Sequence, residues 1–395
     1  MRMNNNKFIP LSVPNLDGNE IQYVTEALKD GWVSSAGPYV EKFEQKIAEY
    51  VKAKGAVSCQ NGTSGIHTAL MTLGVQQEDI VIVPTLTFIA AVNPVKYVGA
   101  TPVFMDCDDS LCMDTEKLQS YLENECTLLE DKTIDNKTGK VIKALIVVHV
   151  FGNMADMERL MEIADKYHIK VVEDATEAIG TYYTSGRYAG KYAGTIGDMG
   201  IYSFNGNKII TTGGGGMMVS DNEEYLKTAK HLTTQAKKDP LYYTHDAVGY
   251  NYRMTSLQAA LGLAQLEQLE KFIAVKNDNF ATYQEKIQGI EGLQLLDCRK
   301  DIRCNRWFYA LNCADYKWNR DTIIKKFQEA GIQSRPVWGL INEQEPYKEE
   351  RAMDITKAKF YVENIVNIPC STNLTEQEIV RVVEILNLNY SRNSI

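Results

Sequence analysis

A single lysine, Lys208, lies in a segment whose composition suits it for chemistry. It is flanked by two apolar runs, 199–204 and 217–219, which are typical of short buried strands. Apart from Ile209 and Ile210, the residues between these runs are small, polar or glycine, and they include four consecutive glycines at 213–216. Glycine accepts unusual dihedrals and leaves room for close approach, so we expect a turn that presents Lys208 beside a bulky group. An exposed lysine in a flexible hairpin is the alternative.

Two carboxylates follow another apolar run. Asp174 ends the strand predicted from Lys170, and Glu177 comes three residues later. Ligands of parallel sheets gather at the carboxyl ends of the strands, so both side chains could face one crevice. A carboxylate buried there without a partner would be costly, and we therefore expect Asp174 to face a cation. A structural salt bridge to an arginine is the alternative.

Two further turns could bind anions or sugars. Residues 61–65 connect a short apolar run to a helix predicted over 66–73, which places backbone amides and the hydroxyls of Thr63 and Ser64 at a helix N-terminus. The turn matches neither GxxxxGK[ST] nor GxGxxG, so a kinase or a Rossmann dehydrogenase lacks its phosphate motif. Ser34 and Ser35 lie in the turn 31–38, where a sugar or phosphate could bind unless the turn is only a linker.

The elements that must position these residues alternate between strand and helix, which predicts an α/β fold with a mainly parallel sheet covered on both faces. We expect the polar insert 128–140 to be a surface excursion. A long helix from 256 toward 288 marks the domain boundary, with a large domain at 1–260 and a smaller α+β domain at 261–395. The smaller domain should contain strands at 307–311 and 333–337 and helices at 320–330, 353–366 and 375–388.

Composition restricts the classes of function. The chain has 395 residues, 44% of them hydrophobic, and a net charge of -9, which argues against nucleic acid or an anionic membrane as the main partner. Its eight cysteines show no CxxC pair, so we expect reduced thiols, no metal site and a cytoplasmic location. The N-terminus has no signal core, and no apolar run reaches membrane-spanning length.

Four motifs follow one another along the chain: Asn-Gly-Thr-Ser at 61–64, Glu-Asp-Ala-Thr-Glu at 173–177, Ser-Phe-Asn-Gly-Asn-Lys at 203–208 after Gly197-Asp198, and Gly-Tyr-Asn-Tyr-Arg at 249–253. In this order they resemble the nucleotide-sugar aminotransferases of the DegT/StrS family, and the resemblance runs from Ile9 to the C-terminal helix. It implies fold type I of the pyridoxal 5'-phosphate (PLP) enzymes, the aspartate-aminotransferase fold. Segments 9–15, 31–35 and 204–216 look most like the branch that aminates C4 on the way to legionaminic acid.

The resemblance also implies a role for each candidate residue. Lys208 would bond covalently to PLP and then act as general base and acid, and Asp174 would pair with the protonated ring nitrogen. Phe88 would stack on the ring, and Asn251 would reach the phosphate from the other subunit of a homodimer. The remaining cofactor contacts are Gly62, Thr63, Ser64, Ser203 and Glu177. The substrate contacts are Ser34, Ser35, Asn205, Arg253 and Arg335.

Some of these positions depart from the common family pattern. Many relatives carry Gln or His where Glu177 stands, and a carboxylate beside the cofactor phenolate would repel it unless protonated. Asn205 replaces a His that is common in relatives. Arg253 and Arg335 suit a donor carboxylate or a nucleotide diphosphate, because a guanidinium binds both in a bidentate manner; structural ion pairs are the alternative.

The predicted reaction is amino transfer from L-glutamate to C4 of a nucleotide-linked 4-keto-6-deoxy-N-acetylhexosamine, with UDP as the expected nucleotide, in bacterial surface-sugar synthesis. Two other classes resemble the same fold. A PLP-dependent sugar dehydratase would have histidine in place of Lys208, and a noncatalytic regulator would lack Lys208 or Asp174. Both residues are present, which favours the aminotransferase.

Overall fold

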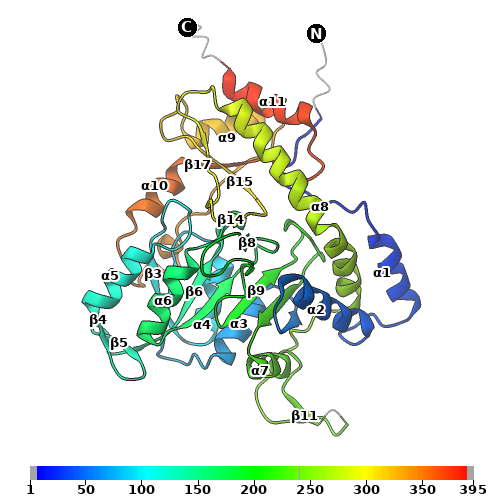
Figure 1. Cartoon of the computed structure of the whole chain (residues 1–395), viewed down its shortest axis with the longest axis vertical. Coiled ribbons are helices and arrows are strands. Elements are labelled where there is room, and N and C mark those ends of the chain that lie inside the picture. Colours follow the sequence, from blue (N-terminus) through cyan, green and yellow to red (C-terminus); the bar gives the residue numbers. More distant parts are fainter. Residues whose placement is uncertain (1–6, 240, 389–395) are drawn as a thin grey trace.

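A mixed, mostly parallel sheet lies at the centre of the larger part of the molecule (Figure 1). The computed structural model describes residues 7–239 and 241–388. Neighbouring strands follow the order β1, β10, β9, β7, β6, β2, β3. Their bounds are β1 (Gly55–Cys59), β2 (Ile80–Pro84), β3 (Thr101–Met105), β6 (Val141–Val148), β7 (Lys170–Asp174), β9 (Met199–Ser203) and β10 (Gly216–Ser220).

Parallel pairing is confined to the middle of this sheet. The pairs β2–β3, β2–β6, β6–β7 and β7–β9 are parallel, whereas β10 runs antiparallel to both β9 and β1. Every residue of β2, β9 and β10 is buried. Because successive side chains point to opposite faces, both faces must be covered, as the continuous apolar runs predict. The covering helices include α2 (Pro38–Val51), α3 (Gly62–Thr72), α5 (Thr115–Glu125), α6 (Met157–Tyr167) and α7 (Glu223–Thr233).

One local expectation was incomplete and another was wrong. Most of the polar insert is exposed, as expected, but β4 (Cys126–Leu128) and β5 (Thr133–Asp135) also form an antiparallel pair that joins the sheet through β6. Its buried polar groups find local partners: the Thr133 hydroxyl donates to the Tyr167 carbonyl over 2.6 Å. The helix expected over 353–366 is shorter than predicted: α10 (Thr356–Asn364) ends where β17 (Ile365–Ile368) begins, and all four residues of β17 are buried.

Helix α8 (Ser256–Ile287) connects the two parts of the molecule (Figure 1). Thr255 and Gln258 form a capping box at its start. Its first half contributes Leu263 to the core around the large sheet, and its second half contributes Phe280 to a separate apolar cluster in the C-terminal part. The boundary at residue 260 stays a prediction.

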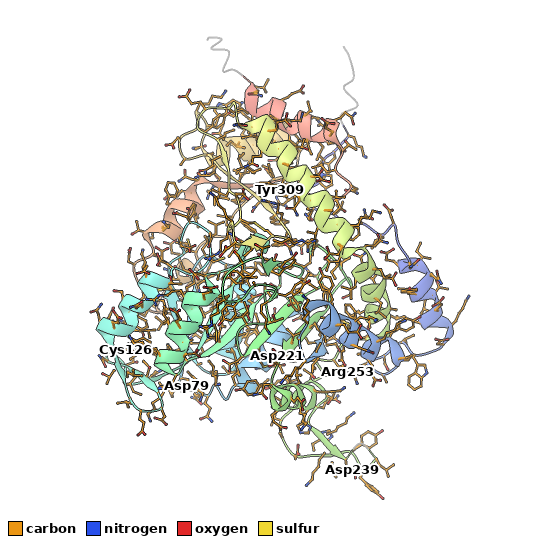
Figure 2. All side chains as sticks on the ribbon, in the orientation of Figure 1. Asp79, Cys126, Asp221, Asp239, Arg253 and Tyr309 are labelled. Carbon is orange, nitrogen blue, oxygen red and sulfur yellow. A yellow bond between two sulfur atoms is a disulfide. The ribbon has the colours of Figure 1, made fainter. Side chains whose placement is uncertain are left out.

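The C-terminal part contains a four-stranded sheet in the order β13, β15, β17, β16, antiparallel throughout. Its bounds are β13 (Gln294–Leu295), β15 (Tyr309–Asn312) and β16 (Arg335–Pro336), with helices α9 (Arg320–Glu329) and α11 (Glu376–Asn387). Tyr309, labelled in this part of the molecule in Figure 2, packs against Phe280 and Tyr283 of α8. This packing ties the small sheet to the connecting helix.

Cysteine usage differs in part from the expectation. Cys298 and Cys304 form a disulfide, whereas the other six cysteines are free thiols. The pair could not be recognised from spacing, because the chain between the two residues must turn back on itself to bring the sulfurs together. Among the described residues, no helix has the combination of length and hydropathy required to cross a bilayer.

Candidate active site

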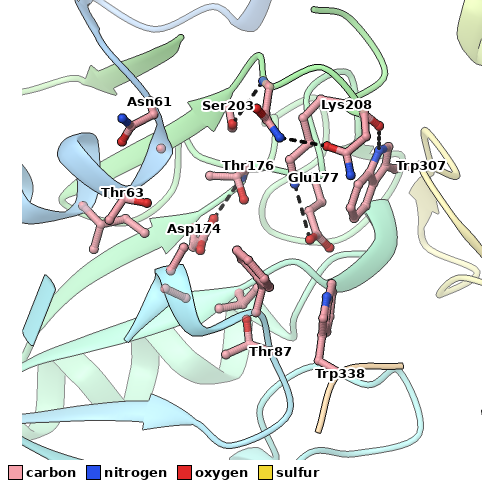
Figure 3. Close-up of a pocket in the computed structure, with 18 of the residues that line it drawn as sticks. Asn61, Thr63, Thr87, Asp174, Thr176, Glu177, Ser203, Lys208, Trp307 and Trp338 are labelled. Atoms are coloured by element: carbon pink, nitrogen blue, oxygen red, sulfur yellow. Dashed lines mark hydrogen bonds and ion pairs between the residues drawn. The ribbon is translucent and has the colours of Figure 1, made fainter. Parts of the chain in front are cut away.

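A cavity of about 370 Å³ lies at the carboxyl ends of the parallel strands (Figure 3). The turns after β2, β7 and β9 and the N-terminus of α3 form one side, and residues from the C-terminal part close the other. The cavity lies where ligands of such sheets are expected. Its lining residues include Asn61, Gly62, Thr63, Thr87, Phe88, Val148, Asp174, Thr176, Glu177, Ser203, Asn205, Asn207, Lys208, Trp307, Phe308 and Trp338.

Lys208 projects into this cavity from the loop after β9. Its side chain is only 13% exposed, and Nζ lies 3.5 Å from Oε1 of Glu177. The indole of Trp307 lies against the same amine, with 3.9 Å between Nζ and the ring centroid. The flexible-hairpin alternative is therefore wrong, since the amine is enclosed between a carboxylate and an aromatic ring.

The glycines after Lys208 provide unusual dihedrals and close approach, as expected, but the group that approaches them is part of the chain itself. None of them lines the cavity. A Cβ on Gly216 would lie 2.8 Å from the carbonyl carbon of Asn61, and a Cβ on Gly215 would lie 2.3 Å from the Thr212 hydroxyl. Gly215 also has a φ of 148°, which other residues rarely adopt. Gly216 therefore lets β10 pack closely against the segment that leads into α3.

Asp174 is buried at the end of β7 and accepts a hydrogen bond from the Thr176 amide over 3.1 Å. Burial raises the pKa of this carboxyl, against the lowering effect of Thr176. In the part of the chain that the structure describes, no lysine or arginine forms a salt bridge with it, so the structural ion pair is not found. Asp174 therefore remains available to a cationic group inside the cavity.

Glu177 is also buried, and its Oε2 accepts a hydrogen bond from the Phe151 amide over 2.8 Å. Burial raises the pKa of Glu177 to about 7, while the nearby Lys208 and the Phe151 amide limit the rise by stabilising the charged form. Near neutral pH, both protonation states of Glu177 are consequently populated.

The N-terminus of α3 offers an anion site, although not with every residue expected. Asn61 and Ser64 form a capping box, in which the Asn61 side chain accepts from the Ser64 amide over 2.8 Å and the Ser64 hydroxyl accepts from the Asn61 amide over 3.2 Å. Ser64 is thereby directed to the helix end and does not line the cavity. For the amides of Gly62 and Thr63, no acceptor is found within residues 7–239 and 241–388. These two amides are thus free to bind an anion.

Gly62 is required by packing at this point. A Cβ there would lie 2.8 Å from Cγ2 of Thr176 and 3.3 Å from Cβ of Ser203. Glycine therefore allows the start of α3 to approach the turns that carry Asp174 and Ser203, and the three elements converge on one end of the cavity.

The candidate substrate contacts are mostly elsewhere in this chain. Asn205 lines the cavity, but Ser34, Ser35, Arg253, Arg335 and the cofactor candidate Asn251 do not. Asn251 is exposed and bridges to Thr234, and the carbonyl of Arg253 accepts a hydrogen bond from Gln60 over 2.6 Å. Arg335 is exposed on β16. The structure thus separates the candidates that line the cavity from those that lie outside it.

Sequence reasoning missed the aromatic wall, which consists of Trp307, Phe308 and Trp338. Trp338 packs on Phe151 with 4.9 Å between centroids, and the rings of Trp307 and Phe308 stack at 3.9 Å. The local signal was a run of three adjacent aromatic residues, 307–309, at the start of a predicted strand. Thr87, Thr176 and Asn207 were also missed, because each is a small polar residue in a turn.

The model of the DegT/DnrJ/EryC1/StrS aminotransferase family matches residues 14–387. The GDP-perosamine synthase of Escherichia coli O157:H7 is 36% identical over 98% of this chain and 99% of its own length. That of Caulobacter vibrioides is 35% identical over 96% and 97%. A DegT DnrJ EryC1 StrS aminotransferase from Brucella abortus superposes with a TM-score of 0.84 at 26% identity, covering 93% of this chain and 94% of that one.

Proposed function

This chain belongs to the DegT/DnrJ/EryC1/StrS aminotransferase family of PLP-dependent sugar aminotransferases, and we propose that it transfers an amino group from L-glutamate to C4 of a nucleotide-linked 4-keto-6-deoxyhexose. The observation that carries the proposal is the convergence of the Lys208 amine, the buried Asp174 carboxylate and two free backbone amides on one cavity. The reaction would take place in the cytoplasm, in the synthesis of bacterial surface sugars.

The residues of the cavity fit PLP. The free amides of Gly62 and Thr63, with the hydroxyls of Thr63 and Ser203, would hold the phosphate at the positive end of α3. Asp174, whose buried carboxylate accepts a hydrogen bond only from the Thr176 amide among the described residues, would accept a hydrogen bond from the protonated ring nitrogen. Phe88, more than half exposed at the cavity, would pack on the ring.

When bound, PLP supplies an aldehyde that accepts the amino group and a cationic ring that withdraws electrons from the reacting carbon. Asp174 would keep the ring nitrogen protonated, because its buried negative charge favours a cation beside it. Lys208 would take the proton from the carbon of L-glutamate that carries the amino group. It would later deliver a proton to C4 of the acceptor sugar. The neighbouring carboxyl of Glu177 would modulate this transfer, since it lies 3.5 Å from the same amine.

For the acceptor, we propose an acetamido sugar linked to UDP, in the branch leading to legionaminic or related acids. The support is the resemblance of segments 31–38 and 204–216 to that branch, together with Asn205 in the cavity wall. A GDP-linked 4-keto-6-deoxy sugar is the second candidate. It is favoured by the names of the E. coli and Caulobacter relatives, each a GDP-perosamine synthase.

The proposed active enzyme is a homodimer in which Asn251 of one subunit completes the site of the other. In this chain, Asn251 is exposed and lies outside the cavity. The nearby hairpin of β11 (Lys237–Asp239) and β12 (Thr244–His245) protrudes from the molecule, with Asp239 labelled on it in Figure 2. Four large apolar side chains around it are at least 73% exposed, which suits a protein interface. They are Leu241, Tyr242, Tyr243 and Val248.

A panel of acceptors tests the proposed function. With L-glutamate as donor, kcat/KM is measured for UDP, GDP and dTDP forms of the 4-keto sugar, with and without the acetamido group, and for pyruvate and oxaloacetate. We expect the UDP-linked acetamido sugar to give the highest value. Preference for the GDP form would support the second candidate, and faster turnover of a small keto acid than of every nucleotide sugar would contradict the substrate class.

A further inference from the structure

Trp307 lies beside the amine of Lys208 in the cavity (Figure 3). Its indole face is 3.9 Å from Nζ, and its Nε1–H donates to the carbonyl of Asn207, the residue before the lysine, over 2.7 Å. The side chain therefore contacts Lys208 in two ways. It faces the charged end of the lysine and it fixes the backbone from which the lysine starts.

The segment before Trp307 is attached to the loop of the other charged partner. Asn305 is fully buried, and its Nδ2 donates to the carbonyls of Glu177 and Ile179, each over 2.9 Å. Its Oδ1 accepts from the Trp307 amide over 2.9 Å. Asn305 and Trp307 thus connect the Glu177 loop to the Lys208 loop, which holds the carboxylate and the amine at a fixed separation.

The carbonyl of Trp307 is held by an unusual partner. Lys276 of α8 is buried, and its Nζ donates to the carbonyls of Trp307 and Cys370 over 3.0 Å and 2.6 Å. No carboxylate pairs with Lys276 in the described ranges of the chain. Burial lowers the pKa of Lys276, and the two carbonyls give its amine hydrogen-bond partners in this buried position. The residue between Asn305 and Trp307, Arg306, has a φ of 52°, a strained value for a residue with a side chain.

We propose that Trp307 is a positioning residue for Lys208, and that Lys276 holds Trp307 in place. The indole face stabilises the charged amine, and the Nε1–H···O bond to Asn207 keeps that amine aimed into the cavity. This proposal rests on the proposed function for the reaction that Lys208 performs. The contacts themselves concern the protein alone, so they can be tested without the cofactor.

Four variants separate the contributions, one of them Lys276→Met, which removes the amine that binds the Trp307 carbonyl. Trp307→Leu removes both the ring and the hydrogen bond but keeps the site apolar, and Trp307→Phe keeps a ring without Nε1–H. Trp318→Phe is the matched control, because Trp318 is also a buried indole beside two lysines, with 4.8 Å to Lys317 and 4.4 Å to Lys326. It belongs to the separate C-terminal cluster.

The first measurement uses apo-protein. The acetylation rate of Lys208 by acetic anhydride is followed by peptide mass spectrometry as a function of pH, while Asp174 and Glu177, the charged groups facing the amine, are left intact. We expect the midpoint of the curve of acetylation rate against pH to fall by about one pH unit in Trp307→Leu, because the charged amine of Lys208 loses its aromatic partner. Trp307→Phe and Lys276→Met should shift it in the same direction by less, and Trp318→Phe should not shift it. An unchanged midpoint in Trp307→Leu, with a native circular dichroism spectrum, would overturn the proposal.

The second measurement uses the PLP-loaded enzyme. We expect kcat of Trp307→Phe to fall about tenfold with less than a twofold change in KM, because a wrongly oriented Lys208 amine slows the chemical step. A raised KM with an unchanged kcat would instead make Trp307 a simple wall for substrate and overturn the proposal. If borohydride fails to trap PLP on Lys208 of the unaltered enzyme, the proposed function fails, while the acetylation experiment still decides the role of Trp307.

Discussion

Oε1 of Glu177 lies 3.5 Å from Nζ of Lys208, and the two side chains are only 4% and 13% exposed. A carboxyl and an amine so close, and so poorly solvated, cannot titrate independently. Burial raises the pKa of Glu177 to about 7, so its charge changes within the physiological range. When Glu177 is ionised, it favours the charged form of Lys208, which is the form that cannot accept a proton.

The first prediction concerns the pH dependence of activity. Glu177→Gln removes the negative charge but keeps the shape of the side chain. We expect the ascending limb of kcat/KM against pH to move about one unit toward lower pH, because Lys208 loses the charge that holds its proton. Glu162→Gln, a change at an exposed ion pair with Arg159, is the control. Superimposable profiles for all three proteins would show that Glu177 does not influence the base.

The second prediction concerns the stability of the apo-protein. The pKa of Glu177 is raised from 4.5 in the unfolded chain to about 7 in the folded one, so the folded state binds the extra proton between these values. Its contribution to stability is fully present below about pH 4.5 and is lost as pH rises through 7. Glu177→Gln should therefore gain stability relative to the unaltered protein at pH 8, by at most about 3 kcal/mol.

Denaturant unfolding of both apo-proteins at pH 5 and pH 8 measures this effect. The difference in free energy of unfolding between the two proteins should increase with pH. A difference that is the same at both pH values would mean that Glu177 titrates normally in the folded state, and would remove the basis of the first prediction as well.

The pattern of short apolar runs in the sequence was sufficient to predict that Lys208, Asp174 and the turn at 61–65 lie together. Lys208, Asp174 and the turn at 61–65 each follow a short apolar run, and parallel strands bring the residues after their carboxyl ends to one edge of the sheet. The reason for the glycine run was not predictable, because it depends on which segment packs against β10. Glycine is required both where two chain segments pack closely and where a ligand approaches the backbone. The sequence alone does not distinguish these two reasons, whereas the fold does.

The aromatic wall could not be predicted for a related reason. Trp307 and Trp338 reach the cavity from the C-terminal part, through segments that carry no chemical motif of their own. Their position depends on α8 and on tertiary hydrogen bonds such as that from Trp307 to Asn207. Ser64 illustrates the opposite error, since a hydroxyl at a helix N-terminus can satisfy the helix itself.

The third prediction is that Lys208→Ala abolishes turnover by several orders of magnitude, because no other amine lines the described cavity. Borohydride treatment of the PLP-loaded enzyme should leave no cofactor on the peptide that contains position 208. Lys166→Ala, at a surface lysine that is 55% exposed, is the control and should behave as the unaltered protein. Normal activity in Lys208→Ala would refute the assignment of the lysine.

The fourth prediction separates charge from shape at Asp174. Asp174→Asn keeps the volume and can still accept a bond from the Thr176 amide, but it carries no charge to stabilise a cation. We expect kcat to fall about 100-fold or more while PLP still binds, because the lost charge acts in a buried, weakly screened site. PLP content is measured by absorbance after gel filtration and kcat by glutamate turnover. Near-normal kcat in a fully loaded variant would make Asp174 purely structural.

The fifth prediction tests a site shared between subunits. Asn251 is exposed and outside the cavity of its own chain, so its proposed contact with PLP requires a second subunit. We expect Asn251→Ala to impair activity about tenfold or more and to weaken PLP binding. Thr234→Ala alters the neighbour that bridges to Asn251 and is the control for local damage.

Mixing Lys208→Ala with Asn251→Ala chains then gives a distinctive result. In a mixed dimer, one of the two sites combines an intact Lys208 from the Asn251→Ala chain with an intact Asn251 from the Lys208→Ala chain. With random exchange of equal amounts, half of the dimers are mixed, so activity should recover to about a quarter of that of the unaltered enzyme. Exchange is verified by native mass spectrometry of chains that carry different tags. Proven exchange without recovery of activity would show that Asn251 does not serve the partner's site.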